Sequence, residues 1–270
     1  QITELIINKK HNMTTYKNSA QAKRETGLSY IGAVNSSAKI LKNEKYNELT
    51  YIIYLAPANL SGYEVCPMRT EECTKACLFG SGQVIMDKTN RVVNSRIKKT
   101  QMFFTNRDYF MQWVVDEIAK FKKQAEKKGM KFSVRLNGTS DIDPTLFKIN
   151  GKTLFETFPD TQFYDYTKVA KRFNLLTKYD NYDLTYSFSG HNWKECEDIL
   201  DNKRGRVAVV FEKNLPATYK GYKVVDGDAY DMRYVDDEGV IVGLKFKRVK
   251  NKIDKTNNPF IIAIDDTNRN

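Results

Sequence analysis

Short apolar runs alternate with polar segments along most of the chain, and one long stretch has a different period. The run LTYIIYLAPANL at 49–60 is rich in β-branched and aromatic side chains and contains a proline, so it predicts a buried strand followed by a loop. Residues 91–128 instead carry apolar side chains three and four positions apart, which predicts helix, and Gly129 is a stop signal.

After Gly129 the chain returns to short apolar runs, which predict further strands. Helix-compatible stretches lie between the earlier runs, at 145–157, 167–178 and 192–202. Alternation of strands and helices favours a parallel sheet, so we expect an α/β fold: a TIM-barrel-like (β/α) barrel, irregular in places, with an inserted cysteine-rich loop. The predicted strands are 132–136, 162–166, 184–188, 207–211, 222–225 and 240–246.

The length of 270 residues suits one large domain. We expect residues 13–270 to form a single α/β catalytic domain. Residues 1–12 are too short for a signal peptide, and we interpret them as an extension ahead of a natural start at Met13.

Polar clusters follow the predicted strands, where parallel strands open on a common edge. Any one cluster is also explained by turn chemistry, because Asn-Gly, Ser-Gly and Asp-Gly are turn sequences. Taken together, the clusters favour one shared pocket. The candidate catalytic residues are Asp141, Asp165 and Asp228. The candidate substrate-binding residues are Asn137, Gly138, Thr139, Ser140, Tyr166, Lys168, Ser187, Ser189 and Asp226.

Carboxylates at such an edge support two kinds of chemistry. Two converging carboxylates can divide labour as nucleophile and general acid or base. The same groups could instead hold Mg²⁺ for phosphoryl chemistry. The chain has no Walker A, GxGxxG, HExxH or GxSxG motif, so we expect no nucleotide cofactor.

Three of the four cysteines, Cys66, Cys73 and Cys77, fall within twelve residues. Without a secretion signal a disulfide framework is not expected, and thiolates suit zinc or an iron–sulfur cluster. Cys196 or His191 is a candidate fourth ligand. The alternative is three buried or free thiols.

The charge balance is basic, with 44 Lys and Arg against 33 Asp and Glu and a net charge of +11. This balance favours attraction to a polyanion such as DNA, although it also fits simple solubility. Lysines cluster at Lys120–Lys131 and Lys245–Lys255, either as contact surfaces or as ordinary solvated faces. No run of 18 apolar residues occurs, so no membrane partner is expected.

The order of many short motifs resembles the phage "gene product 88" family over roughly residues 17–250. These motifs are YLAPANLSGYEVCP (54–67), ECTKACLFGSG (72–82), VNSRIKKTQMFF (93–104), VRLNGTSDI (134–142), FYDYTK (163–168), YDLTYSFSG (182–190), VAVVF (207–211), VVDGDAYDMRY (224–234) and GVIVGLKFK (239–247).

We associate this family with phage 7-deazaguanine DNA transglycosylases of the DpdA type, relatives of the queuine tRNA-ribosyltransferases, which are TIM barrels. The resemblance implies an enzyme of the host cytoplasm that replaces guanine in DNA by a base such as preQ0 and protects phage DNA from restriction. An Asp would attack C1′, and a second carboxylate would manage the proton.

Two features depart from the tRNA enzymes. The thiols here come early in the chain and at a different spacing, and the Asp-Ser-Gly-Gly-Phe signature is absent. The aspartates are therefore chosen by position alone. A metal-dependent DNA nuclease or phosphoesterase and a non-catalytic DNA-binding anti-defence protein are the alternatives.

Overall fold

The computed structural model describes residues 18–34, 38–77, 87–247 and 258–264. The segment 1–12, which we interpreted as an extension, and residues 248–255 of the second lysine cluster lie outside the described residues. Within the described ranges, no helix is both long and apolar enough to cross a membrane.

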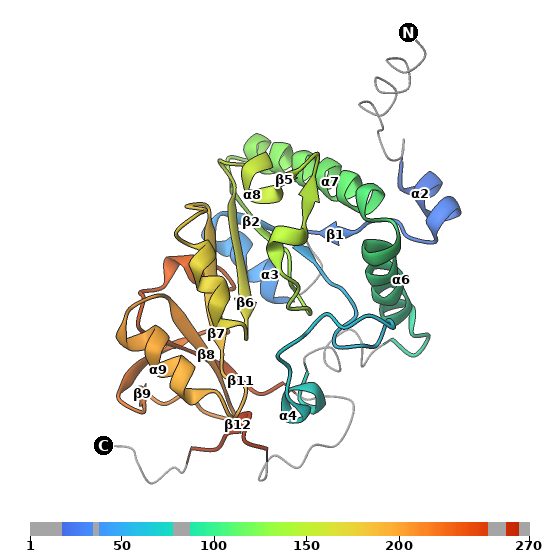
Figure 1. The fold of residues 1–270 in the computed structure, drawn as a ribbon. Coiled ribbons are helices and arrows are strands. Elements are labelled where there is room, and N and C mark those ends of the chain that lie inside the picture. Colours follow the sequence, from blue (N-terminus) through green and yellow to red (C-terminus); the bar gives the residue numbers. More distant parts are fainter. Residues whose placement is uncertain (1–17, 35–37, 78–86, 248–257, 265–270) are drawn as a thin grey trace.

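A large sheet organises the chain (Figure 1), and seven of its strands run parallel to their neighbours in the order β2-β3-β6-β7-β8-β11-β10. Short β1 and β9 pair antiparallel at the two edges, and β12 runs parallel to the end of β8. The strands are β1 (Gly32–Ala33), β2 (Glu48–Ile53), β3 (Lys131–Arg135), β6 (Gln162–Thr167), β7 (Tyr182–Ser187), β8 (Arg206–Phe211), β9 (Thr218–Tyr219), β10 (Tyr222–Asp226), β11 (Ile241–Lys245) and β12 (Ile261–Ile262).

The α-helices are α2 (Ser19–Thr26), α3 (Ala38–Asn43), α4 (Glu71–Lys75), α6 (Arg91–Thr105), α7 (Arg107–Lys127), α8 (Leu154–Thr157) and α9 (Trp193–Asp201). The 3-10 turns are η1 (Glu44–Tyr46), η3 (Pro144–Leu146), η4 (Ala170–Leu175) and η5 (Arg233–Val235). Helical segments connect most successive parallel strands, which is the α/β alternation that the sequence predicts.

The predicted strands are confirmed, whereas three helix predictions need correction. Residues 145–157 form a 3-10 turn, the hairpin of β4 (Lys148–Ile149) and β5 (Lys152–Thr153), and short α8. Asn150 and Gly151 take positive φ values of 51° and 79°, which sets a tight hairpin turn in place of a helix. Residues 167–178 form only the 3-10 turn η4, and residues 91–128 form two helices separated at Asn106.

The α/β class is confirmed, but the described strands do not close into a barrel. The strand path has two ends, β1 and β9, so in the described part of the chain the sheet is open. The parallel strands β2, β3, β6, β7 and β8 nevertheless neighbour one another in chain order, as consecutive βα units in a barrel do, whereas β11 lies between β8 and β10 although β10 precedes it in the chain.

The two faces of the sheet differ in polarity. One face carries apolar side chains, such as Val134, Phe163 and Val207, which are fully buried. Helix α7 packs on β2 and β3, and α9 packs on β7 and β8. The other face is polar and is covered by η5 and α3, which contact β7 and β2 respectively.

Side-chain hydrogen bonds hold the polar face together. Asp231, next to η5, accepts from Arg135 Nη1 at 2.8 Å and from the Tyr164 hydroxyl at 3.0 Å. The Thr50 and Ser133 hydroxyls of neighbouring strands lie 2.9 Å apart. Buried polar groups need such partners, so this layer fixes the 229–236 segment on the sheet.

Candidate functional site

The carboxyl edge of the sheet gathers the loops that follow β2, β3, β6 and β7, because these strands are parallel. The loop after β2 carries the cysteines and α4. The hydroxyl of Thr70, the N-cap of α4, donates to Ser189 O at 3.2 Å, which joins α4 to the loop after β7. In Figure 1, α4 accordingly lies near the lower end of the sheet, away from α7 and α8.

Asp141 joins three segments at this edge. Its carboxylate accepts from the Thr167 hydroxyl at 2.8 Å, from Lys168 N at 2.9 Å and from Arg172 Nη1, with which it forms a salt bridge. Its backbone N donates to Val65 O at 2.7 Å. Only 8% of the residue is exposed. A guanidinium and two further donors therefore hold this carboxylate in place against the segment after β6.

Asp165 lies close to Asp141 in a different environment. It is 2% exposed, and its carboxylate accepts from Asn137 N at 2.7 Å and from Asn137 Nδ2 at 3.3 Å. Burial raises its pKa to about 7, while the Asn137 hydrogen bonds and Arg135 lower it and the charge of Asp141 raises it further. The two neighbouring carboxyls therefore differ in their partners, because Arg172 forms a salt bridge with Asp141 whereas Asn137 donates to Asp165.

The Asn137–Ser140 segment makes turn contacts that hold the edge in place. Asn137 Oδ1 accepts from the Ser140 hydroxyl at 2.8 Å and from Ile142 N at 3.0 Å, and Thr139 Oγ1 donates to Leu55 O at 2.5 Å. A Cβ at Gly138 would come within 2.7 Å of the Ile53 carbonyl oxygen. Glycine is therefore required by the close approach of two strand ends.

Asp228 is held apart from that pair. It follows β10, and β7, β8 and β11 lie between β10 and β6. Its carboxylate accepts from Lys247 Nζ at 2.8 Å and Lys245 N at 2.9 Å, while Asp226 Oδ1 accepts from Asp228 N at 2.8 Å. Of the three aspartates chosen from the sequence, the structure thus brings two together.

The other predicted binding residues occupy mixed surroundings. The Tyr166 ring stacks under the Arg135 guanidinium, whose Cζ lies 4.5 Å from the ring centroid. Ser187 O and Ser189 N bond the two ends of the Asn192 side-chain amide, so these serines shape the loop ahead of α9.

Two of the three early cysteines, Cys66 and Cys73, lie beside Lys168. The Lys168 ammonium is hydrogen-bonded to Cys73, and although burial lowers its pKa, the nearby Cys73, Asp141 and Cys66 groups raise it overall. Cys66 Sγ accepts from Ala58 N at 3.5 Å, and burial raises the pKa of this thiol to about 12. Cys77 interacts electrostatically with Cys66. The structure therefore places Cys66 near both Lys168 and Cys77, and the metal site stays a prediction.

Neither candidate fourth ligand joins the thiols directly. Cys196 is fully buried on the apolar face of α9, and His191 lies 3.7 Å from Glu72 on α4. Among the residues that the structure describes, no three His, Cys, Asp or Glu side chains are arranged to hold a metal ion. The Lys168 ammonium interacts with Cys73 and Cys66, whereas Cys77 interacts electrostatically with Arg96.

Sequence reasoning missed Arg172 and the Arg135–Asp231 pair. Arg172 lies in a stretch that was expected to be an amphipathic helix, so nothing marked it as the partner of Asp141. The alternation of Ser133 and Arg135 with apolar neighbours along β3 did carry a signal, because alternating polar positions share one face of a strand.

A family model described as Gene product 88 matches residues 13–259. No curated protein matches the chain, and no solved structure does. The family match covers most of the chain, including every residue of the carboxyl edge described above.

Proposed function

The chain belongs to the phage gene product 88 family, and we propose that it is a DNA-modifying transglycosylase that exchanges guanine for a 7-deazaguanine base such as preQ0. The finer parts of the proposal are an incomplete TIM-type barrel as the scaffold, action on phage DNA in the host cytoplasm, and protection of that DNA from restriction. Strand order supports the scaffold, because the parallel strands β2, β3, β6, β7 and β8 are neighbours in chain order.

One observation carries the proposal: the neighbouring carboxyls Asp141 and Asp165 lie at the edge where α/β enzymes build their sites. The salt bridge with Arg172 holds the Asp141 carboxylate in a fixed position, as a nucleophile requires. Burial brings the pKa of Asp165 to about 7, which suits a group that gives and takes a proton at neutral pH. Base exchange needs these two properties in two different groups.

In the first step, an oxygen of Asp141 attacks C1′ of a deoxyguanosine and forms an ester bond. The C1′–N9 bond breaks, and guanine leaves with the electron pair and takes the proton of Asp165. In the second step, N9 of the incoming 7-deazaguanine attacks C1′ and releases Asp141. Asp165 accepts the N9 proton, so both carboxyls return to their starting state. The target nucleotide must be single-stranded or flipped from the duplex.

Mass spectrometry of nucleosides tests this function. DNA incubated with the protein and isotope-labelled preQ0 should acquire the labelled deoxynucleoside. Asp141→Asn and Asp165→Asn should each lower incorporation by at least ~100-fold, the size of a typical acid–base contribution. Asp228→Asn is the matched control and should retain activity, because its contacts lie at β10 and β11. Incorporation at the wild-type rate by Asp141→Asn would refute the assignment.

Two-metal hydrolysis has less support from this geometry. Mg²⁺ sites in phosphoryl-transfer enzymes use carboxylates that converge on open space. Here Asp141 is engaged by Arg172 and Asp165 by Asn137. For the thiols we propose zinc or an iron–sulfur cluster held by Cys66, Cys73 and Cys77, which would require the Lys168 ammonium to move aside.

A further inference from the structure

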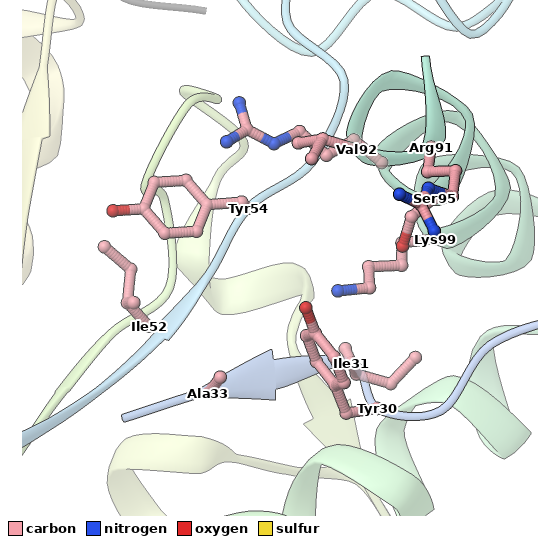
Figure 2. Close-up of a pocket in the computed structure, with 10 residues that line it drawn as sticks. Tyr30, Ile31, Ala33, Ile52, Tyr54, Arg91, Val92, Ser95 and Lys99 are labelled. Carbon is pink, nitrogen blue, oxygen red and sulfur yellow. The ribbon is translucent and has the colours of Figure 1, made fainter. Parts of the chain in front are cut away.

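A cavity of about 250 Å³ lies outside the carboxyl pair, between β1, β2 and the first turns of α6. Figure 2 shows Lys99 and Tyr30 approaching each other in this cavity, with Tyr54 across from them. Three basic side chains, Arg91, Arg96 and Lys99, line it. The rest of the lining is Tyr30, Ile31, Ala33, Ile52, Tyr54, Val92 and Ser95, which includes no carboxylate.

Lys99 is the most unusual of these residues, because it is 4% exposed. Its Nζ lies 4.0 Å from the centroid of the Tyr30 ring. Among the described residues it forms no hydrogen bond or ion pair, although it is attracted to Glu117 at longer range. A buried ammonium normally has a hydrogen-bonded partner of opposite charge, so this one lacks an acceptor.

Glu117 does not supply that acceptor, because other donors already use it. Its carboxylate accepts from Ile31 N at 3.0 Å, from Gly32 N at 2.8 Å and from the Tyr51 hydroxyl at 2.7 Å. The start of α6 is satisfied as well, since Val92 N donates to Asp87 at 2.6 Å. The Lys99 ammonium therefore still lacks an acceptor, whereas Arg91 Nε already donates to the Thr89 hydroxyl at 2.9 Å.

We propose that this cavity binds the phosphate group of a nucleotide, with Lys99, Arg91 and Arg96 around the phosphate and the Tyr30 and Tyr54 rings against the sugar or base. Clustered basic groups suit a phosphate dianion, and tyrosine rings stack on bases. The Arg96 guanidinium lies 4.8 Å from the centroid of the Tyr54 ring, so a positive charge and a ring that can stack on a base lie side by side. The volume is small for a ligand pocket, which fits one nucleotide.

The protonation of Lys99 gives a second way to detect phosphate binding. Burial lowers its pKa to about 7, while Glu117 on α7 raises it and Arg96 on α6 lowers it. Arg91, Ser95 and the two tyrosines are the other polar groups that line the cavity. A bound phosphate adds negative charge beside Lys99 and raises this pKa, so binding should take up a proton near pH 7. Calorimetry in two buffers of different ionisation heat measures that uptake.

The experiment is calorimetric titration of the full chain with dGMP, with deoxyguanosine and with inorganic phosphate. The wild type should bind dGMP and bind deoxyguanosine at least ~10-fold more weakly, because charge-assisted hydrogen bonds to the phosphate are lost. Lys99→Met and Arg91→Gln should each weaken dGMP binding by ~10-fold or more. Lys98→Met, an equal charge loss on the exposed side of α6, is the matched control and should bind normally.

A single-stranded oligonucleotide without terminal phosphates separates the two sources of the ligand. If Arg91→Gln weakens binding of both the oligonucleotide and dGMP, the site takes a phosphate within a DNA strand. If it weakens binding of dGMP alone, the site takes a free nucleotide. Normal dGMP binding by Arg91→Gln, which alters an exposed residue and should fold, would overturn the proposal. Absence of dGMP binding by the wild type would overturn it too. Asp141→Asn should leave this binding unchanged, so the result stands apart from that of base exchange.

Discussion

The surroundings of a carboxyl group in this protein can change its pKa strongly, and Asp165 is the clearest case. Its pKa rises from 3.8 to about 7 on folding, so the folded state holds its proton more tightly than the unfolded state does. That contribution to stability is complete below about pH 4 and is lost as the pH rises to about 7. Asp165→Asn should remove this pH dependence. Urea unfolding of both proteins from pH 4 to pH 7.5 measures it, and parallel curves would contradict the assignment.

The thiols around Lys168 give a second prediction at the scale of residues. Protein purified under anaerobic, reducing conditions should contain about one zinc per chain, or iron with visible absorption. Cys73→Ser should lose the metal and melt at a lower temperature, since ligand loss removes folding free energy. Cys196→Ala, in the core of α9, should keep the metal. Metal-free protein with normal stability would contradict the proposed metal site.

Among the elements, α7 changes the interpretation of the first lysine cluster. This helix ends at Lys127, and Lys131 begins β3, so the cluster lies at the amino edge of the sheet. The candidate site lies at the opposite edge. Lys127→Glu with Lys128→Glu should therefore change DNA affinity little, whereas Lys245→Glu with Lys247→Glu, at the carboxyl edge, should weaken it about tenfold or more. Electrophoretic mobility shifts at one salt concentration compare them, and a reversed order would contradict this placement.

The strands were predictable from sequence and several connections were not. Runs such as VAVVF carry their own signal, because a buried parallel strand is continuously apolar. The 145–157 stretch has helix-like spacing, but a positive φ at Asn150 turns it into a hairpin. The residues of the candidate site likewise divide into those predictable from the sequence and those that were not. Asp141 and Asp165 were found from their strand ends, whereas Arg172 and Lys99 depend on contacts across the fold.

At the scale of the whole molecule, the net charge of +11 predicts how strongly the proposed binding to DNA depends on salt. A basic protein that neutralises several phosphates releases counterions, so its DNA affinity should fall steeply and log-linearly with salt. Filter binding between 50 and 200 mM salt, roughly the range over which such losses are large, measures the slope. A flat response would argue against DNA as the partner.

The covalent intermediate tests the central claim most directly. Wild-type protein mixed with DNA in the absence of any 7-deazaguanine, then denatured rapidly, should carry DNA esterified to Asp141 and should have released guanine. Peptide mass spectrometry locates the ester, and Asp141→Asn should yield neither adduct nor free guanine. An adduct on another residue, or guanine release by Asp141→Asn at the wild-type rate, would contradict the account.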